Sequence, residues 1–178
     1  MEHILIVVDM QNDFVDGVLG SPEAVAILPA VVRKIKEHEG DIIFTRDTHA
    51  ENYMDTREGK YLPVPHCVKG TVGWEINPRV WEAACGRSGV TVIDKPTFGS
   101  TELSNLLSER HEKAPIRQVT LIGVCTDICV ISNAMLIKAA LPEIDVAVDA
   151  ACCAGVTPLS HENALNAMSA CQIIIQNV

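Results

Sequence analysis

The sequence predicts an α/β protein in which helices cover both faces of a parallel sheet. Short apolar runs without polar alternation recur along the 178 residues, as in strands that are buried on both faces. Longer segments with helical signals lie between most of these runs, so strands and helices alternate. We therefore expect a doubly wound, three-layer α/β/α sandwich with a six-stranded, mostly parallel sheet, formed by residues 1–178 as a single domain.

Six apolar runs supply the expected strands. They cover residues 4–8, 41–45, 90–93, 118–122, 144–148 and 171–175. The first run ends at Asp9, the third is followed by Asp94 and Lys95, and the fifth stops at Asp149. In open α/β sheets ligands bind outside the carboxyl ends of the strands, so polar residues at these ends are candidates for function.

Five segments have helical signals, at residues 28–38, 78–84, 101–110, 126–140 and 160–170. Pro29 fits the first turn of the first of them, and Gly40 lies just beyond its end. Polar residues able to cap three of the others are Ser100 or Thr101, Thr126 or Asp127, and Ser160. Residues 46–73 are expected to form a long irregular loop, and such a loop in a compact domain is usually functional.

Composition excludes several classes of protein. The net charge is −9, which argues against nucleic acid or an anionic membrane as the main partner. No apolar run approaches the roughly 18 residues of a membrane span. The first residues lack the features of a signal peptide, and the seven cysteines are an odd number without zinc-finger spacing. We therefore expect a cytoplasmic protein with reduced thiols.

The segment Gly123-Val-Cys125-Thr-Asp-Ile-Cys129-Val130 is the strongest candidate for chemistry. It follows an apolar strand and opens a helix, so Cys129 falls in the first helical turn. Unpaired N–H groups there favour a thiolate and can also hold an oxyanion. Asp9 and Lys95 end two other strands and are expected at the same edge of the sheet. Asp9 could accept the thiol proton, and Lys95 could stabilise the developing charge.

A second constellation combines carboxylate and imidazole groups. Asp47 and His49 are two residues apart and, leaving a strand, point the same way. His66 lies in the long loop that can fold back to them, and Glu58 is a possible fourth ligand. Such a mixed set suits zinc, iron or manganese. The alternative for these residues is an acidic surface loop with incidental histidines.

Taken together, the motifs resemble the isochorismatase-like cysteine hydrolases, and among these the nicotinamidases. The resemblance runs over essentially the whole chain. It rests on five motifs in the expected order: Asp9-Met-Gln-Asn-Asp-Phe14, Asp47-x-His49, Pro65-His66-Cys67-Val-x-Gly70-Thr71-x-Gly73, Lys95 after the third strand, and Gly123-Val-x-Thr-Asp-x-Cys129-Val130.

The resemblance implies a catalytic triad of Asp9, Lys95 and Cys129. It implies an oxyanion hole from the backbone N–H groups of Cys125 and Cys129, with a non-proline cis peptide just before Cys125. It also implies a divalent metal, most often zinc, held by Asp47, His49 and His66 with Glu58 as a fourth ligand. Phe14 matches an aromatic residue of the substrate pocket, and the other residues that we place in this pocket are Leu62, Trp74 and Ile128.

The sequence also departs from the nicotinamidase pattern. Leu62-Pro63-Val64 stands where many members carry a stacking aromatic residue, Ile128 where some have histidine, and Cys125 where alanine is usual. These differences concern the substrate and leave the hydrolase chemistry intact.

We expect hydrolysis of a small amide, nicotinamide to nicotinate and ammonia as the first choice, by a homo-oligomer (a dimer or tetramer). A carbamoyl or ureido amidohydrolase, or a related hydrolase of another small substrate, is the alternative. A non-enzymatic metal or redox sensor is a third reading. A dinucleotide-binding module is disfavoured, because Gly17-x-x-Gly20 is not a G-x-G-x-x-G turn.

Overall fold

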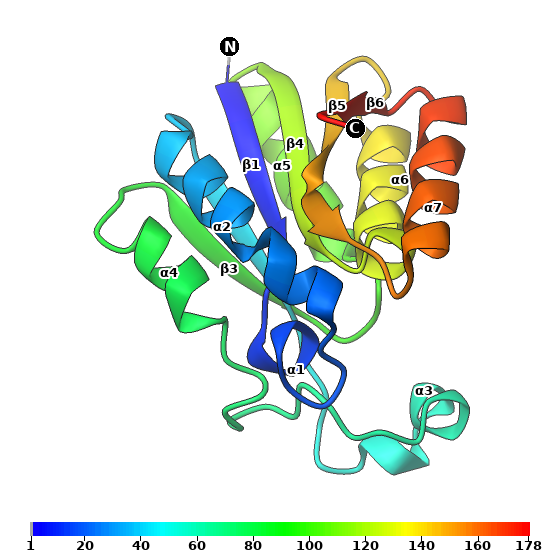
Figure 1. The fold of residues 1–178 in the computed structure, drawn as a ribbon. Coiled ribbons are helices and arrows are strands. Elements are labelled where there is room, and N and C mark those ends of the chain that lie inside the picture. The colour runs from blue at the N-terminus through cyan, green and yellow to red at the C-terminus, as the bar shows by residue number, and fades with distance from the viewer. Residues whose placement is uncertain (1) are drawn as a thin grey trace.

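The computed structural model describes residues 2–178, which form a three-layer α/β/α sandwich (Figure 1). The six strands make one sheet in the order β3-β2-β1-β4-β5-β6, and all five neighbouring pairs are parallel. The expected fold class is therefore confirmed. The strands are β1 (Glu2–Val8), β2 (Ile42–Asp47), β3 (Val90–Lys95), β4 (Ile116–Val124), β5 (Asp145–Ala154) and β6 (Ile174–Gln176).

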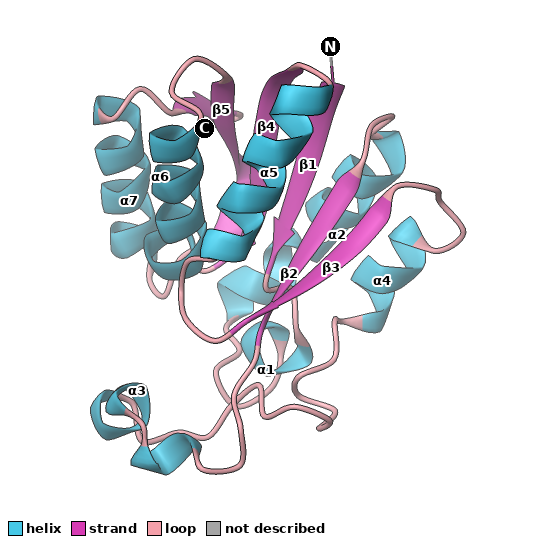
Figure 2. Cartoon of the chain, turned by 180° about the vertical axis from the view of Figure 1, so that it is seen from behind, coloured by secondary structure: helices cyan, strands magenta, loops and turns pink. Residues whose placement is uncertain are grey.

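Helices cover both faces of the sheet, as the opposite views of Figures 1 and 2 show. On one face α2 (Pro22–Glu37) and α4 (Pro78–Ala84) pack on inward-facing residues such as Leu5, Val7 and Phe44. On the other face lie α5 (Thr101–Lys113), α6 (Ile131–Ala140) and α7 (Pro158–Ala170). The strand order reverses between β1 and β4, and such a switch point is where open α/β sheets bind ligands.

Several helix ends differ from the sequence prediction. Helix α4 and the Ser100 cap of α5 are confirmed. Helix α2, however, begins at Pro22 rather than at residue 28, because Ser21 caps it by accepting a hydrogen bond from the Ala24 N–H (3.0 Å). Pro29 therefore lies inside the helix rather than in its first turn.

Helix α7 begins at Pro158, and its cap is Thr157 rather than Ser160. The Ser160 N–H donates to the Thr157 hydroxyl, and the Thr157 N–H donates to the Ser160 hydroxyl, so the two form a capping box. Ser160 is thus the third residue of α7 and the second member of this capping box.

The segment after β4 is not one continuous helix. Residues Thr126–Val130 form a π-helical turn, and the α-helical part α6 begins at Ile131. The expected caps are wrong because both side chains have partners elsewhere. The Thr126 hydroxyl lies 2.7 Å from Nδ1 of His161, and a carboxylate oxygen of Asp127 accepts from the Val156 N–H at 3.0 Å.

Strand β5 continues past Asp149 to Ala154, with a register shift against β4. Asp149 therefore lies inside the strand, where its buried carboxylate pairs with Lys34 at 2.7 Å and accepts from the Asn177 amide. The last strand, β6, begins later than expected, at Ile174, since Cys171 is the C-cap of α7.

The long segment between β2 and α4 contains two short helical turns that the sequence did not predict. They are η1 (Tyr53–Asp55) and α3 (Arg57–Tyr61), and they extend away from the sheet (Figure 1). A third short helix, α1 (Asn12–Val15), follows β1. No helix among residues 2–178 is long and apolar enough to cross a membrane.

Candidate active site

Three strand ends bring Asp9, Lys95 and Cys129 together at the carboxyl edge of the sheet. Nζ of Lys95 lies 2.7 Å from Oδ2 of Asp9 and 3.6 Å from Sγ of Cys129. Asp9 and Lys95 have no exposed surface, and Cys129 is 5% exposed. The residues are far apart in the sequence, so their meeting follows from the parallel order of β1, β2, β3 and β4.

The surrounding backbone fixes each of the three side chains. Asp9 follows β1 in a left-handed conformation (φ 49°), and its Oδ1 accepts a 2.7 Å hydrogen bond from the Thr45 hydroxyl. Lys95 is the last residue of β3, and its ammonium also donates to the Thr97 carbonyl oxygen at 3.1 Å. Cys129 lies in the π-helical turn after β4.

Burial governs the protonation of this group. It raises the pKa of Asp9, and the Lys95 charge opposes the shift. Burial also raises the pKa of the Cys129 thiol well above its ordinary value, and the nearby Asp9 carboxylate adds to the effect. The sequence pattern favoured a thiolate, but the structure favours a neutral thiol, because desolvation and the Asp9 charge outweigh Lys95. The pKa of Lys95 is raised despite its burial, since Asp9 and Asp47 stabilise the cation.

The turn from Cys125 to Cys129 presents backbone N–H groups beside the thiol. The peptide between Val124 and Cys125 is cis, as the family resemblance implied. The N–H groups of Ile128 and Val130 both donate to the Cys125 carbonyl oxygen, at 3.1 and 3.0 Å. The N–H of Cys129, between them, does not share this acceptor. Donors in such a turn can stabilise an oxyanion that forms next to the sulfur.

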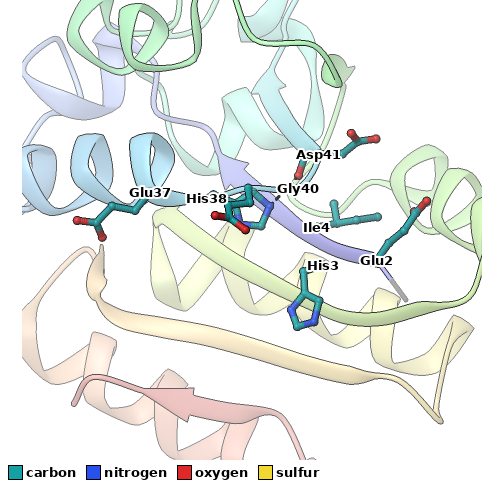
Figure 3. Close-up of a pocket in the computed structure, with 8 residues that line it drawn as sticks. Glu2, His3, Ile4, Glu37, His38, Gly40 and Asp41 are labelled. Atoms are coloured by element: carbon teal, nitrogen blue, oxygen red, sulfur yellow. Dashed lines mark hydrogen bonds between the residues drawn. The ribbon is translucent and has the colours of Figure 1, made fainter.

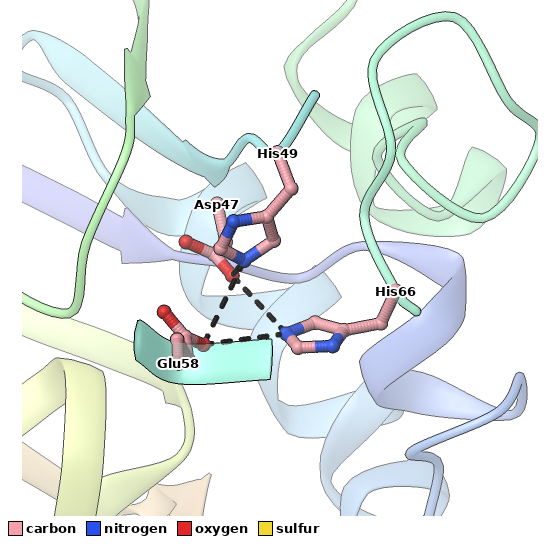
Figure 4. Close-up of side chains that lie close together, drawn as sticks. All are labelled: Asp47, His49, Glu58 and His66. Atoms are coloured by element: carbon pink, nitrogen blue, oxygen red, sulfur yellow. Dashed lines mark hydrogen bonds and ion pairs between the residues drawn. The ribbon is translucent and has the colours of Figure 1, made fainter. Parts of the chain in front are cut away.

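Asp47, His49, Glu58 and His66 form the second part of the site (Figure 4). Their ligand atoms all lie within 4.8 Å of one another, and no other such group of three or more occurs among residues 2–178. Nε2 of His49 is 2.9 Å from Oδ2 of Asp47, and Nε2 of His66 is 3.5 Å from the same oxygen. Oε1 of Glu58 lies 3.7 Å from both imidazole nitrogens.

These four side chains fit a divalent cation. The other ring nitrogen of His66, Nδ1, pairs with the Val64 carbonyl oxygen at 2.8 Å, which leaves Nε2 to face the cluster. Gln11 holds the end of β2 because its amide oxygen accepts from the Asp47 N–H and its NH₂ donates to the Asp47 carbonyl. Burial alone would raise the pKa of Asp47, but hydrogen bonds from His49 and His66 and the Lys95 charge lower it. The donor set is therefore anionic and oriented, as zinc, iron or manganese requires.

The two parts of the site are adjacent. Oδ1 of Asp47 lies 3.4 Å from Nζ of Lys95, which itself lies next to Cys129. A molecule bound to a metal at the cluster would thus be next to the thiol.

Aromatic rings surround the histidines. The ring of Phe14 is 5.4 Å from that of His66, and its contact with substrate stays a prediction. Tyr53 was not anticipated from the sequence, yet its ring lies 4.7 Å from His49 and 5.0 Å from His66. No sequence signal identified it, because Tyr53 lies well before the Leu62-Pro63-Val64 segment in which a stacking aromatic residue was expected.

Three further residues were expected to line the pocket. Leu62 is 38% exposed, and its carbonyl accepts from the Tyr53 hydroxyl. Ile128 packs at the margin of the core that contains Cys129. The Trp74 ring is covered by the Arg46 guanidinium at 3.7 Å, and its indole N–H donates to the Thr48 hydroxyl. The contacts with substrate of all three residues remain predictions.

A pocket of about 640 Å³ lies at the opposite edge of the sheet, around the start of β1 and the turn before β2 (Figure 3). His3, His38 and four carboxylates surround it, and the His38 ring is bonded to the Asp41 carbonyl oxygen. It lies at the amino ends of the strands, away from Asp9, Lys95 and Cys129. This pocket is therefore separate from the reactive side chains at the carboxyl ends of the strands.

Comparison with known proteins agrees with the site. The family model of the isochorismatase domain matches residues 3–177. This chain belongs to the isochorismatase family. It is 34% identical over 148 residues to the isochorismatase family protein PncA of Bacillus subtilis, covering 76% of this chain and 78% of that protein.

It is also 30% identical over 146 residues to the nicotinamidase/pyrazinamidase of Mycobacterium tuberculosis, covering 71% of this chain and 73% of the relative. The crystal structure of the Pyrococcus horikoshii pyrazinamidase in complex with zinc superposes with a TM-score of 0.79. It is 30% identical, and the match covers 100% of both chains.

These relatives place the chain among the amide hydrolases of the family. The zinc of the Pyrococcus structure and the four-residue cluster found here together support a divalent-metal site.

Proposed function

We propose that this protein is a metal-dependent cysteine amidohydrolase that converts nicotinamide to nicotinate and ammonia. The observation that carries the proposal is the contact chain from the metal-ligand cluster through Lys95 to Cys129, at 3.4 and 3.6 Å. With Asp9 at 2.7 Å from Lys95, these contacts support a nucleophile, a base and a substrate-binding position spaced for one small molecule. Similarity to nicotinamidases supports the choice of substrate.

The first step is attack by sulfur. The Asp9 carboxylate takes the proton of the Cys129 thiol as the sulfur bonds to the amide carbon. Burial raises the pKa of Asp9, so it is a stronger base than an ordinary carboxylate. Lys95 keeps its proton and stabilises the negative charge that passes between Asp9 and sulfur.

The amide oxygen becomes an oxyanion in the tetrahedral intermediate. The backbone N–H groups of Cys125 and Cys129 donate to it and lower the barrier. Collapse breaks the C–N bond, and protonated Asp9 gives its proton to the leaving nitrogen, which departs as ammonia. Water then attacks the thioester, and Asp9 accepts a proton from it. The C–S bond breaks to release the acid, and Asp9 returns its proton to the sulfur, which restores the thiol.

The metal site would serve substrate binding. When bound by Asp47, His49, His66 and Glu58, a divalent cation supplies a Lewis-acidic position for the second lone-pair donor of a flat amide, such as the ring nitrogen of nicotinamide. Zinc is the metal that we propose, with iron and manganese as alternatives. The Phe14 ring, which contacts His66, covers one side of the bound ring.

Steady-state ammonia release tests the proposal. The substrates are nicotinamide, a carbamoyl amine and a ureido acid, each assayed with added zinc. We expect nicotinamide to be the best of the three, and Cys129→Ala to lower its turnover by more than about a thousandfold. Cys153→Ala is the matched control, because Cys153 is a second buried thiol in the same core cluster and has no place in the mechanism.

Two results would count against the assignment. If another of these amides gives Cys129-dependent ammonia release and nicotinamide gives none, the substrate is wrong and the family chemistry stands. If Cys129→Ala retains full activity on every amide that is turned over, the nucleophile is wrong.

A further inference from the structure

Asn133 lies on α6 one turn after Cys129 and is fully buried. Its NH₂ group donates to two carbonyl oxygens, that of Cys129 at 2.8 Å and that of Phe98 at 3.2 Å. Its side-chain oxygen accepts from the Ser100 N–H at 2.9 Å. One side chain thus joins the nucleophile's own backbone to the turn that follows β3.

That turn is held closely against α6. A Cβ at Gly99 would come within 2.7 Å of Cδ1 of Leu136 and 3.4 Å of Ser132, so a larger residue there would force the Leu136 side chain to move. Ser100, at the end of the turn, caps α5 by accepting from the Leu103 N–H. The turn therefore has fixed attachments to both α5 and α6.

The same turn contains a hydrogen-bond partner of Lys95. The Thr97 carbonyl oxygen accepts from Nζ at 3.1 Å, on an ammonium that otherwise contacts the carboxylates of Asp9 and Asp47 and the sulfur of Cys129. If the turn moved, Nζ would lose the Thr97 carbonyl oxygen, and the two carboxylates would set its position relative to the sulfur.

We propose that Asn133 is a positioning residue that sets the distance between the Lys95 ammonium and the Cys129 sulfur by clamping residues 98–100 to the nucleophile's carbonyl. Its relevance to turnover rests on the proposed function of Cys129. Asn133 is buried and bonds only to backbone groups. It should therefore change the rate of the reaction through Lys95 and leave the affinity for substrate almost unchanged.

Asn133→Thr separates the two roles of the side chain. A threonine hydroxyl can still donate to the carbonyl four residues back, here that of Cys129, but it is too short to reach Phe98 and Ser100. Asn133→Ser makes the same local bond with less bulk and replaces the threonine variant if that does not fold. Ser104→Ala is the control, because it removes one buried hydrogen bond from α5 without touching the turn.

Two measurements are made on the zinc-loaded proteins. We expect kcat for ammonia release to fall about 10- to 100-fold in the Asn133 variants, as for a small misplacement of reacting groups, with KM changed by less than about threefold. The rate of Cys129 alkylation by iodoacetamide at one fixed pH, followed by mass spectrometry of its peptide, should fall several-fold because Lys95 favours the thiolate. The Ser104→Ala variant should match wild type in both.

The inference is overturned if Asn133→Thr or Asn133→Ser folds and keeps wild-type kcat and alkylation rate, or if the Ser104→Ala variant loses as much of both. If wild type turns over no amide while the Asn133 variants still slow alkylation, the proposed function fails and the positioning role stands.

Discussion

Replacing Lys95 with methionine should destabilise the protein far more than loss of an ordinary lysine. The Lys95 ammonium has no exposed surface and neutralises Asp9, itself fully buried, at 2.7 Å and Asp47 at 3.4 Å. Methionine keeps the length of the side chain but leaves both carboxylates without their cation. Removing one partner of a buried ion pair costs about 3–5 kcal/mol. For a chain of this size that corresponds to a melting temperature about 6–20 °C lower.

The assay is equilibrium unfolding in urea at pH 7, with chelator present so that metal binding does not contribute. Lys69→Met is the matched control. Lys69 also faces a carboxylate, that of Asp94 at 3.7 Å, but its side chain is 66% exposed, so its loss should cost about 0–1 kcal/mol.

A double variant tests the cause. In Asp9→Asn/Lys95→Met the charge of Asp9 is removed together with its partner, so we expect the double variant to be more stable than Lys95→Met alone. The reasoning is refuted if Lys95→Met costs no more than Lys69→Met. It is also refuted if the two substitutions in the pair add without coupling.

Two further predictions concern the metal and pH. Added zinc should raise the melting temperature of chelator-treated protein, because a ligand that binds only the folded state stabilises it, and His66→Ala should abolish this rise; an equal rise in the variant would exclude His66 as a ligand. Burial lowers the pKa of His161 in the folded protein, where its Nδ1 pairs with the Thr126 hydroxyl. The stabilising contribution of the neutral His161 side chain is therefore complete above the unfolded-state pKa of about 6.5. It is lost as the pH falls through the lower pKa of the folded state. The difference in urea midpoint between wild type and His161→Ala should therefore shrink from pH 8 to pH 5, and a constant or growing difference would contradict this assignment.

The amino-acid pattern alone predicts the fold class and the edge of the sheet at which the reactive side chains meet. Short apolar runs without alternation are typical of strands covered on both faces, and the chain has enough helical segments to cover them. Because parallel strands end at one edge, Asp9, Lys95 and Cys129 could be placed together from their positions alone. The i, i+2 spacing of Asp47 and His49 likewise predicted that they would share a site, because the local backbone sets that geometry.

Features that depend on contacts between distant segments follow only from the three-dimensional structure. The raised pKa of the Cys129 thiol follows from burial and the Asp9 charge rather than from its place at the start of a helix. Tyr53 became part of the metal site because the segment after β2 folds back over the histidines.

The turn after β4 shows the same limit. Thr126 and Asp127 are good caps by residue type, yet their side chains bond to His161 and to the Val156 N–H. No sequence pattern marked Asn133 as part of the site. Its partners Phe98 and Ser100 lie more than thirty residues earlier, in the turn that follows β3. Local propensities describe what a residue can do with its neighbours in the chain. Which partner it takes is decided by the side chains and backbone groups that the fold brings within hydrogen-bond distance.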